Sequence, residues 1–426
     1  MKFLIVNITI FFLISSCLNA QMPFDKHFVD KSMRVDLILA GDALAQSAYI
    51  IDIKKEPHWG GSHTALIDTF NYGEYRFLII NKNSGDTLYT RGFCTLFEEW
   101  RTTEEANSSK RAFYHSVTFP YPKANISFVL QSREKDGSFI ELYSSLINPK
   151  NANIKVVKDS PYEVIPVINN GDSEHMLDLT FIAEGYRKDE MKKFKANVEQ
   201  QARYLLSQSP FKEAKDKINV WAICSPSIDN GPSEPEKKNW SQTAVSSAFN
   251  TFYVDRYLET YDVKSIRDIA CAAPYDHIVV LVNSDRYGGG GIYNHFSIGT
   301  SDHALSKKVL IHEIGHGLFG LADEYYTSDV AYQDFFNLKI EPWQPNVTTL
   351  VDFESKWLKL LPQDYPIPTP TDNKYKDTTG VFEGGGYVAK GVYRPAYNCR
   401  MKSNEAKGFC EVCEQSGLKM INFLTK

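Results

Sequence analysis

The sequence has few features of a nucleic-acid-binding protein or of a protein with several membrane spans. Its 426 residues carry 47 Lys and Arg against 52 Asp and Glu, a formal net charge of −5, and no run of basic residues. A nucleic-acid surface needs clustered positive charge, so no nucleic-acid partner is expected. Beyond the first twenty residues, no apolar stretch is long enough to cross a bilayer as a helix.

Cysteines are scarce, and one pair alone has metal-binding spacing. The seven positions are Cys17, Cys94, Cys224, Cys271, Cys399, Cys410 and Cys413. Cys410 and Cys413 form a CxxC, but the lack of a second CxxC argues against a structural zinc knuckle. In an oxidising compartment, we expect a disulfide between Cys399 and either Cys410 or Cys413.

Four consecutive glycines, residues 288–291, lack the following Lys and Ser or Thr of a phosphate-binding loop. Nucleotide binding is therefore not expected. We expect instead an edge strand that lines a cleft, where free backbone groups could pair with an extended peptide. His295, a few residues later, is a candidate cleft residue, with a structural role as the alternative.

The first twenty residues predict export. Lys2 is followed by an apolar run from Phe3 to Ile14 that is too short to be a stable membrane span. Residues 14–17 have the form of a lipoprotein box, in which Cys17 would be lipidated. A cut after Ala20 would instead release the protein. We expect an outer-membrane or cell-surface lipoprotein, alternatively a periplasmic or secreted protein, with membrane contact only through this anchor.

The remaining chain predicts an α+β protein of two domains. Residues 21–165 contain short alternating or β-branched runs separated by turn signals, which indicates an all-β, sandwich-like domain. A polar, turn-rich link follows at 168–173. Residues 170–426 alternate strands with helices and predict an α/β domain. The strands are expected at 177–183, 218–224 and 277–283, and the helices at 188–207, 244–261 and 264–271.

A metal-binding motif lies within this second domain. His312, Glu313 and His316 form an HExxH, on a helix expected from 304 to 319 with Ser301 or Asp302 as its N-cap. Side chains four residues apart share one helix face, so both imidazoles can hold one metal ion. Glu313 is then placed as the general base of a zinc peptidase.

A catalytic zinc site needs a third protein ligand. Gly320 is a plausible helix stop, and the chain beyond it can return Asp323 to the metal. Glu324 is the nearest competitor for this position. A gluzincin-like arrangement, with Glu341 or Glu354 on a later helix, is the rival, but no clear helix is predicted around either residue.

The motif resembles that of metzincins with one residue inserted, because glycine and acid each come one position later than in HExxHxxGxxH. Downstream, Cys399-Arg400-Met401 looks like the metzincin turn that carries a methionine beneath the metal. HExxHxxxGLxDEY at 312–325, the preceding β-rich domain and this turn together resemble the IgA-peptidase-like family of bacterial metalloproteases. The resemblance covers residues 30–426.

This resemblance implies a metzincin-like α/β zinc-protease domain and a set of site residues. Its metal-ligand positions correspond to His312, His316 and Asp323, and its catalytic base to Glu313. A tyrosine that helps to hold the metal or the oxyanion has three candidates: Tyr387, Tyr393 and Tyr397.

The predicted function is that of an exported endopeptidase that uses Zn2+. Its partners would be protein or peptide substrates, with host glycoproteins as candidates; immunoglobulin A itself does not follow, because specificity depends on cleft residues outside the motif. The alternative is a non-enzymatic surface lipoprotein that binds protein or glycan through the same cleft.

Overall fold

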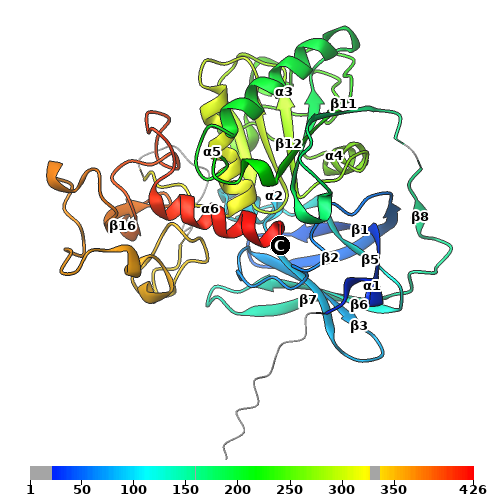
Figure 1. The fold of residues 1–426 in the computed structure, drawn as a ribbon, viewed down its shortest axis with the longest axis horizontal. Coiled ribbons are helices and arrows are strands. Elements are labelled where there is room, and N and C mark those ends of the chain that lie inside the picture. Colours follow the sequence, from blue (N-terminus) through cyan, green and yellow to red (C-terminus); the bar gives the residue numbers. More distant parts are fainter. Residues whose placement is uncertain (1–21, 159, 327–335) are drawn as a thin grey trace, which may run out of the picture.

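The computed structural model describes residues 22–158, 160–326 and 336–426 (Figure 1). The predicted export segment, with Cys17 and its lipoprotein box, lies outside these described residues. Within the described part of the chain, no helix combines the length and the apolar character that a membrane crossing requires.

The amino-terminal domain is a β-sandwich, as predicted. One sheet has the order β5-β1-β2-β8 and the other β4-β3-β6-β7. Their bounds are β1 (Phe28–Gly41), β2 (Gln46–Glu56), β3 (Tyr75–Asn81), β4 (Thr87–Phe93), β5 (Arg111–Pro122), β6 (Ile126–Arg133), β7 (Phe139–Ile147) and β8 (Lys155–Val156). Side chains of both sheets, such as Val35 and Leu37 of β1 and Phe77 and Phe128 of the facing sheet, share one core. Two short helices, α1 (Phe24–His27) and α2 (Leu96–Arg101), flank it.

The strand that precedes the turn-rich link at 168–173 belongs to the sheet of the second domain. β9 (Glu163–Ile168) pairs antiparallel with β11 (Ile218–Cys224) of the second sheet. It is the edge strand of that sheet, a position that tolerates Pro166 because one side of the strand needs no ladder hydrogen bonds. β9, which spans the predicted end of the first domain at residue 165, is thus part of the second sheet.

The second domain is built on a mixed sheet of order β13-β14-β12-β10-β11-β9. Its further strands are β10 (Leu177–Glu184), β12 (His277–Val282), β13 (Gly289–Ile292) and β14 (Phe296–Thr300). β10, β11, β12 and β14 run parallel, and every residue of β10 and β12 is buried. The three predicted strands are thus confirmed to within a residue.

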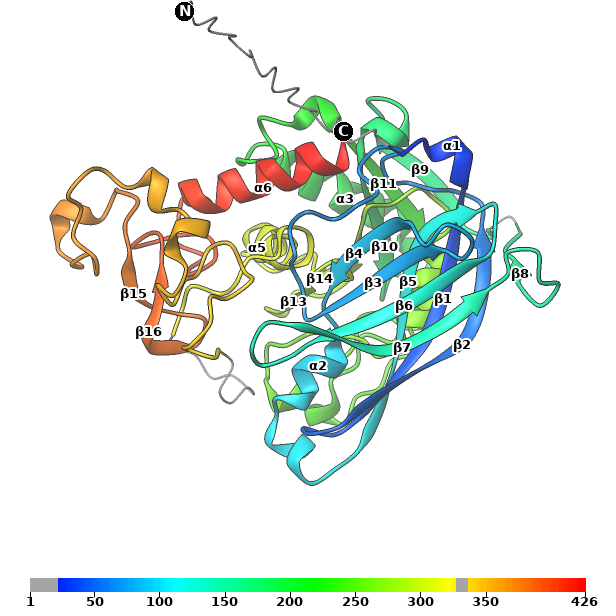
Figure 2. The same cartoon turned by 90° about the horizontal axis from the view of Figure 1, so that it is seen from below.

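Helices cover both faces of this sheet (Figure 1). α3 (Met191–Leu205) and α5 (Ser306–Phe319) share one core with the strands, and α4 (Val263–Ala270) packs into a separate core on the other face. Figure 2 shows β13 and β14 lying beside α5, between that helix and strands of the sandwich. The helix predicted at 188–207 is present with shorter ends, and the one predicted at 264–271 is present one residue earlier.

The prediction of a helix at 244–261 is wrong. The segment is irregular, with one 3-10 turn at Thr251–Tyr253 and isolated bridges. The carboxylate of Glu184 accepts hydrogen bonds from the backbone N–H of Val245 and Ser247, each at 2.9 Å. Along the segment, Ser246, Asn250, Phe252 and Tyr253 have positive φ values of 51–65°, which α-helical residues do not adopt, so the chain cannot continue as a helix.

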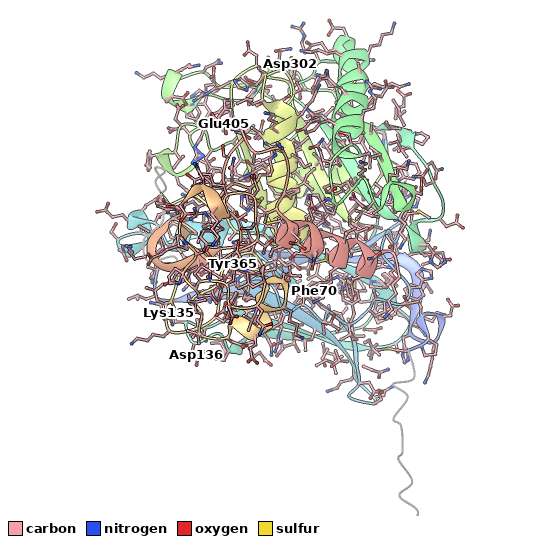
Figure 3. All side chains as sticks on the ribbon, turned by 60° about the vertical axis from the view of Figure 1, so that its left-hand side comes forward. Phe70, Lys135, Asp136, Asp302, Tyr365 and Glu405 are labelled. Carbon is pink, nitrogen blue, oxygen red and sulfur yellow. The ribbon has the colours of Figure 1, made fainter. Side chains whose placement is uncertain are left out.

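The carboxy-terminal region forms the wall beyond α5. It contains the hairpin β15 (Phe382–Gly385) and β16 (Val388–Arg394) and ends in α6 (Glu411–Leu424). Figure 3 shows α6 crossing one end of α5, with Asp302 beside the opposite end. The 3-10 helices are η1 (Glu104–Asn107), η2 (Ser173–His175), η3 (Lys188–Glu190), η4 (Lys215–Lys217), η5 (Pro235–Lys237), η6 (Thr251–Tyr253), η7 (Phe353–Ser355), η8 (Leu358–Leu360) and η9 (Asn373–Tyr375).

Candidate active site

The helix that carries the HExxH motif ends as predicted and begins later than predicted. Leu305 is its N-cap, without a side-chain hydrogen bond, so neither Ser301 nor Asp302 caps it. At the other end, Gly320 adopts a left-handed conformation with φ of +66°. Leu321 then donates from its backbone N–H to the carbonyl of Gly315 at 3.1 Å, which reverses the chain. The reversal returns Asp323 to the helix.

Two imidazoles and one carboxylate converge at this point. Oδ1 of Asp323 lies 3.1 Å from Nε2 of His312 and 3.3 Å from Nε2 of His316. The two Nε2 atoms are 3.0 Å apart. Around a tetrahedral zinc ion, ligand atoms bonded at about 2.0–2.2 Å lie about 3.3–3.5 Å from one another. The spacing is therefore close to that of a zinc ligand set.

Backbone carbonyls orient both histidine rings. Nδ1 of His312 donates to the carbonyl of Arg400 at 2.9 Å, and Nδ1 of His316 donates to that of Leu321 at 2.6 Å. Each neutral ring then carries its proton on Nδ1 and directs the lone pair of Nε2 inward. Two lone pairs and the carboxylate of Asp323 face one another, and Oδ1 has no hydrogen-bond donor among the described residues. A positive charge placed between the three groups, as a proton or as a metal ion, would satisfy them.

The electrostatics agree with this demand for positive charge. Burial opposes a proton on His316, but the adjacent Asp323 raises its pKa to about 9. Burial likewise opposes charge on Asp323, and the two histidines outweigh it and hold its pKa well below the usual value. The site thus favours a positive charge between these groups, which a metal ion would supply in place of a proton.

Glu313 lies next to this ligand set. Its carboxylate also comes within 4.8 Å of the two imidazoles, so it is a second acid that could approach the ion. Asp323 is the third group in direct contact with both Nε2 atoms, whereas Glu313 is partly exposed to the cleft. Burial raises the pKa of Glu313. This placement suits a group that exchanges protons with substrate and water.

A tight turn with a methionine packs beneath the helix. Met401 is fully buried. Its Sδ packs against Gly315, which lies between the two histidines in the sequence, and would be 2.8 Å from a Cβ added there. The carbonyl of Cys399 accepts from the backbone N–H of Lys402 at 2.9 Å and closes the turn. The adjacent Arg400 carbonyl is the group that orients His312. The turn therefore supports the ligand set from below.

The site opens into a cavity of about 270 Å³. β13 is the edge strand of its sheet and lines this cavity, as predicted. A Cβ on Gly291 would lie 2.2 Å from the carbonyl oxygen of Glu313, so glycine is required for the strand to approach α5. The sandwich domain contributes Cys94 and Glu99 to the lining, and Glu99 accepts a hydrogen bond from the hydroxyl of Tyr257.

Of the three candidate tyrosines, Tyr387 reaches the site. Its hydroxyl donates to Oδ2 of Asp323. Tyr393 and Tyr397 lie away from the cavity: the backbone of Tyr393 pairs with Thr348, and the ring of Tyr397 packs 6.2 Å from that of Phe382. Those two cleft assignments are corrected, because their hairpin and loop face other parts of the carboxy-terminal region.

His295 is also not a cleft residue. It is 3% exposed and lies between the two domains, with its ring 4.4 Å from that of His115. The structural alternative holds for this residue.

The gluzincin-like alternative finds no support in the geometry. Glu341 accepts hydrogen bonds from the hydroxyl of Thr349 at 3.2 Å and the backbone N–H of Asp352 at 3.0 Å. Glu354 lies on the exposed side of a 3-10 turn. Neither residue is part of the described cavity lining. Glu324 points away from the histidines, and its Oε1 accepts from Asn346 at 3.0 Å.

Two residues that line the cavity, Arg256 and Tyr325, were not predicted as site residues from the sequence. The guanidinium of Arg256 lies 5.8 Å from the ring centre of Tyr325, and both residues line the cavity. Tyr325 directly follows the acidic pair of the motif, which could have identified it. Arg256 had no such signal, because its segment is an irregular loop whose position depends on hydrogen bonds from distant residues.

Comparison with known families agrees with these features. Residues 165–377 and 371–421 match the family model described as IgA Peptidase M64, and residues 23–144 match the one described as Peptidase M64 N-terminus. No curated protein matches the chain. The matched ranges cover both domains and more than half of the sequence.

Proposed function

Because the chain belongs to the IgA peptidase M64 family, and so is a peptidase, we propose that it is an exported, zinc-dependent endopeptidase with metzincin-like chemistry. The observation that carries this proposal is the convergence of Nε2 of His312, Nε2 of His316 and Oδ1 of Asp323 within 3.0–3.3 Å of one another. Three lone-pair donors this close, with both Nδ1 atoms already bonded, are a ligand set for a cation.

These three residues would hold Zn2+, which when bound polarises a scissile carbonyl and lowers the pKa of water from about 15.7 to about 7. Glu313 accepts the proton of the attacking water and passes it to the nitrogen of the leaving amine. Tyr387 fixes the carboxylate of Asp323 through its hydroxyl, so that Oδ1 stays directed at the histidines. The carbonyls of Arg400 and Leu321 keep both rings in the required tautomer.

The substrate is proposed to be a protein or peptide bound in extended form. β13 is the edge strand beside Glu313, and its residues line the cavity. The carbonyl of Gly289 already accepts from the backbone N–H of Leu258 at 3.4 Å, so the backbone of Gly291 and Ile292 is the part proposed to pair with the peptide. Host glycoproteins remain proposed substrates. Export, and a lipid anchor on Cys17, rest on residues 1–20 of the sequence alone. The alternative of a non-enzymatic binder is not favoured in a peptidase family.

The test is cleavage of a mixed peptide library by the full chain, read by mass spectrometry. We expect cleavage at internal bonds, its loss after zinc is removed with a chelator, and its return on adding Zn2+. In Glu313→Gln, kcat should fall by about 10²–10⁴-fold, the usual contribution of a general base, while bound zinc is unchanged. Unchanged cleavage by this variant refutes the assigned base, and wild-type protein without activity on any library favours a binding protein.

A further inference from the structure

Three cysteines and one glutamate meet in the interior behind the catalytic cleft. Cys399, Cys410, Cys413 and Glu324 each offer a ligand atom, and these atoms all lie within 4.8 Å of one another. Glu324, Cys399 and Cys413 are fully buried. The expected disulfide is absent: all six cysteines in the described part of the chain are free thiols, and Sγ of Cys399 lies 3.8 Å from Sγ of Cys413.

We propose that this cluster is a second metal site, a closed structural centre in which three thiolates and one carboxylate hold a zinc-class divalent cation. A tetrahedral zinc site with metal–sulfur bonds of about 2.3 Å has sulfur–sulfur edges of about 3.8 Å and sulfur–oxygen edges of about 3.5 Å. The distances are 3.8 Å from Cys399 to Cys413 and 3.3 Å from Cys413 to Oε1 of Glu324. Thiolate ligands favour zinc over calcium or magnesium.

The carboxylate supplies an independent sign of a missing partner. Oε2 of Glu324 is buried and has no hydrogen-bond donor among the described residues, although Oε1 is bonded to Asn346 and Cys413. A buried carboxylate oxygen without a partner is strongly destabilising. A cation at the centre of the cluster would remove this cost.

One of the three sulfur atoms already accepts a backbone hydrogen bond. The backbone N–H of Cys410 donates to Sγ of Cys399 at 3.2 Å, a contact that stabilises a thiolate. Burial raises the pKa of Cys399 and of Cys413, whereas at Cys410 the hydrogen bonds from these two thiols outweigh burial and lower the pKa, so without a cation only one of the three thiolates is favoured. Metal binding would release the thiol protons and fix all three sulfurs as thiolates.

A disulfide would satisfy the cluster less completely. It requires two sulfurs about 2.05 Å apart, whereas Cys399 and Cys413 are separated by 3.8 Å. Any one disulfide would use two of the three cysteines and leave the third thiol and Glu324 buried together. A metal ion uses all four residues. The sequence argument against a zinc knuckle assumed a second CxxC, but the additional ligands come from Cys399 and Glu324.

The position of the cluster suggests what the ion does. A bound ion would link three segments: the start of α6, the turn at 399–401 and the loop after α5. Glu324 donates from its backbone N–H to the carbonyl of Met401 at 2.8 Å, and it directly follows Asp323. Arg400, in the same turn, orients His312. The second ion would thus position two catalytic-site ligands without touching substrate.

Metal stoichiometry of the full chain tests this proposal. Protein produced in zinc-supplemented medium should contain two zinc ions per chain, and a His312→Ala/His316→Ala variant should retain one. X-ray absorption of that variant should show three sulfur ligands and one oxygen or nitrogen ligand. Cys413→Ser should lose the sulfur-bound ion, whereas the matched control Cys224→Ser, which replaces a buried thiol outside the cluster, should keep both ions.

Two results would overturn the second site. One is a histidine variant that binds no zinc, and the other is a disulfide from Cys399 to Cys410 or Cys413 found by mass spectrometry of the alkylated wild-type protein. Both measurements remain decisive if cysteine variants fail to fold. If the wild-type protein still cleaves peptides in either case, the second site is refuted and the proposed function is left intact.

Discussion

Asp323 and Glu324 are consecutive acidic residues whose side chains lie on opposite sides of one loop. Oδ1 of Asp323 lies 3.1 Å from Nε2 of His312, whereas Oε1 of Glu324 accepts from Sγ of Cys413 at 3.3 Å. Successive side chains of an extended backbone point in opposite directions, so one carboxylate faces the cleft and the other faces the interior. This answers the question of which acid accompanies the histidines.

Removing the charge of Asp323 should disable the site. Asp323→Asn keeps the size of the side chain but provides a neutral oxygen that binds a cation weakly. We expect kcat/KM to fall at least about a hundredfold, because even residues that only orient metal ligands contribute 10–100-fold. Peptide cleavage and zinc content check this. Asp302→Asn, at an exposed position near α5, is the matched control and should stay within about twofold.

The hydroxyl of Tyr387 should matter through Asp323. Tyr387→Phe removes the donor to Oδ2 and frees the carboxylate to rotate. Zinc affinity or kcat/KM should fall by about 10–100-fold, the usual effect of losing an orienting partner. Tyr397→Phe provides the control, since Tyr397 lies away from the cavity. Equal activity of the two variants would show that Tyr387 does not orient Asp323.

The close approach of β13 to α5 should be intolerant of any side chain. In Gly291→Ala the new Cβ would lie 2.2 Å from the carbonyl oxygen of Glu313, so the strand must move away. We expect a loss of about 1–3 kcal/mol in the free energy of unfolding and a marked fall in kcat. Gly408→Ala is the control, because a Cβ there meets no atom within 4 Å. Unfolding in urea and peptide cleavage measure both effects.

Local patterns predicted the parts of the molecule whose structure is determined locally. The buried strands and the end of α5 followed from continuous apolar runs and from Gly320. The HExxH spacing alone places His312 and His316 on one helix face. The Cys-x-Met turn was found because it is a short continuous motif.

Features that depend on distant partners were not predicted. The irregular segment 244–261 has helical spacing, but four of its residues have positive φ, and Glu184 of β10 binds the backbone near its start. The cluster around Cys410 was dismissed because its other ligands are separated in sequence. His295 was considered for the cleft, with a structural role as the alternative, and the packing of the two domains decides its surroundings.

Three buried histidines should make the protein sensitive to acid. Burial, reinforced by Arg267, lowers the pKa of His115 and of His277 to about 3, and burial with His115 nearby lowers the pKa of His295 well below its usual value. In the unfolded chain all three would titrate near 6.5. Between these values the unfolded state binds more protons, so stability is complete above about pH 6.5 and declines as pH falls toward about 3.

Where a histidine is protonated only in the unfolded chain, the free energy of unfolding should fall by about 1.4 kcal/mol for each pH unit of acidification. For the three histidines together the slope is about 4 kcal/mol per pH unit. Urea unfolding of the zinc-loaded protein at several values between about pH 7 and pH 5 measures it. His115→Phe keeps an aromatic ring stacked on Phe93, whose centre lies 4.8 Å away, and should reduce the slope by about one third. His175→Gln, at a side chain that is 60% exposed, should leave it unchanged. If His115→Phe retains the wild-type slope, His115 is not held neutral by burial, and acid sensitivity must arise from other groups, such as the metal ligands.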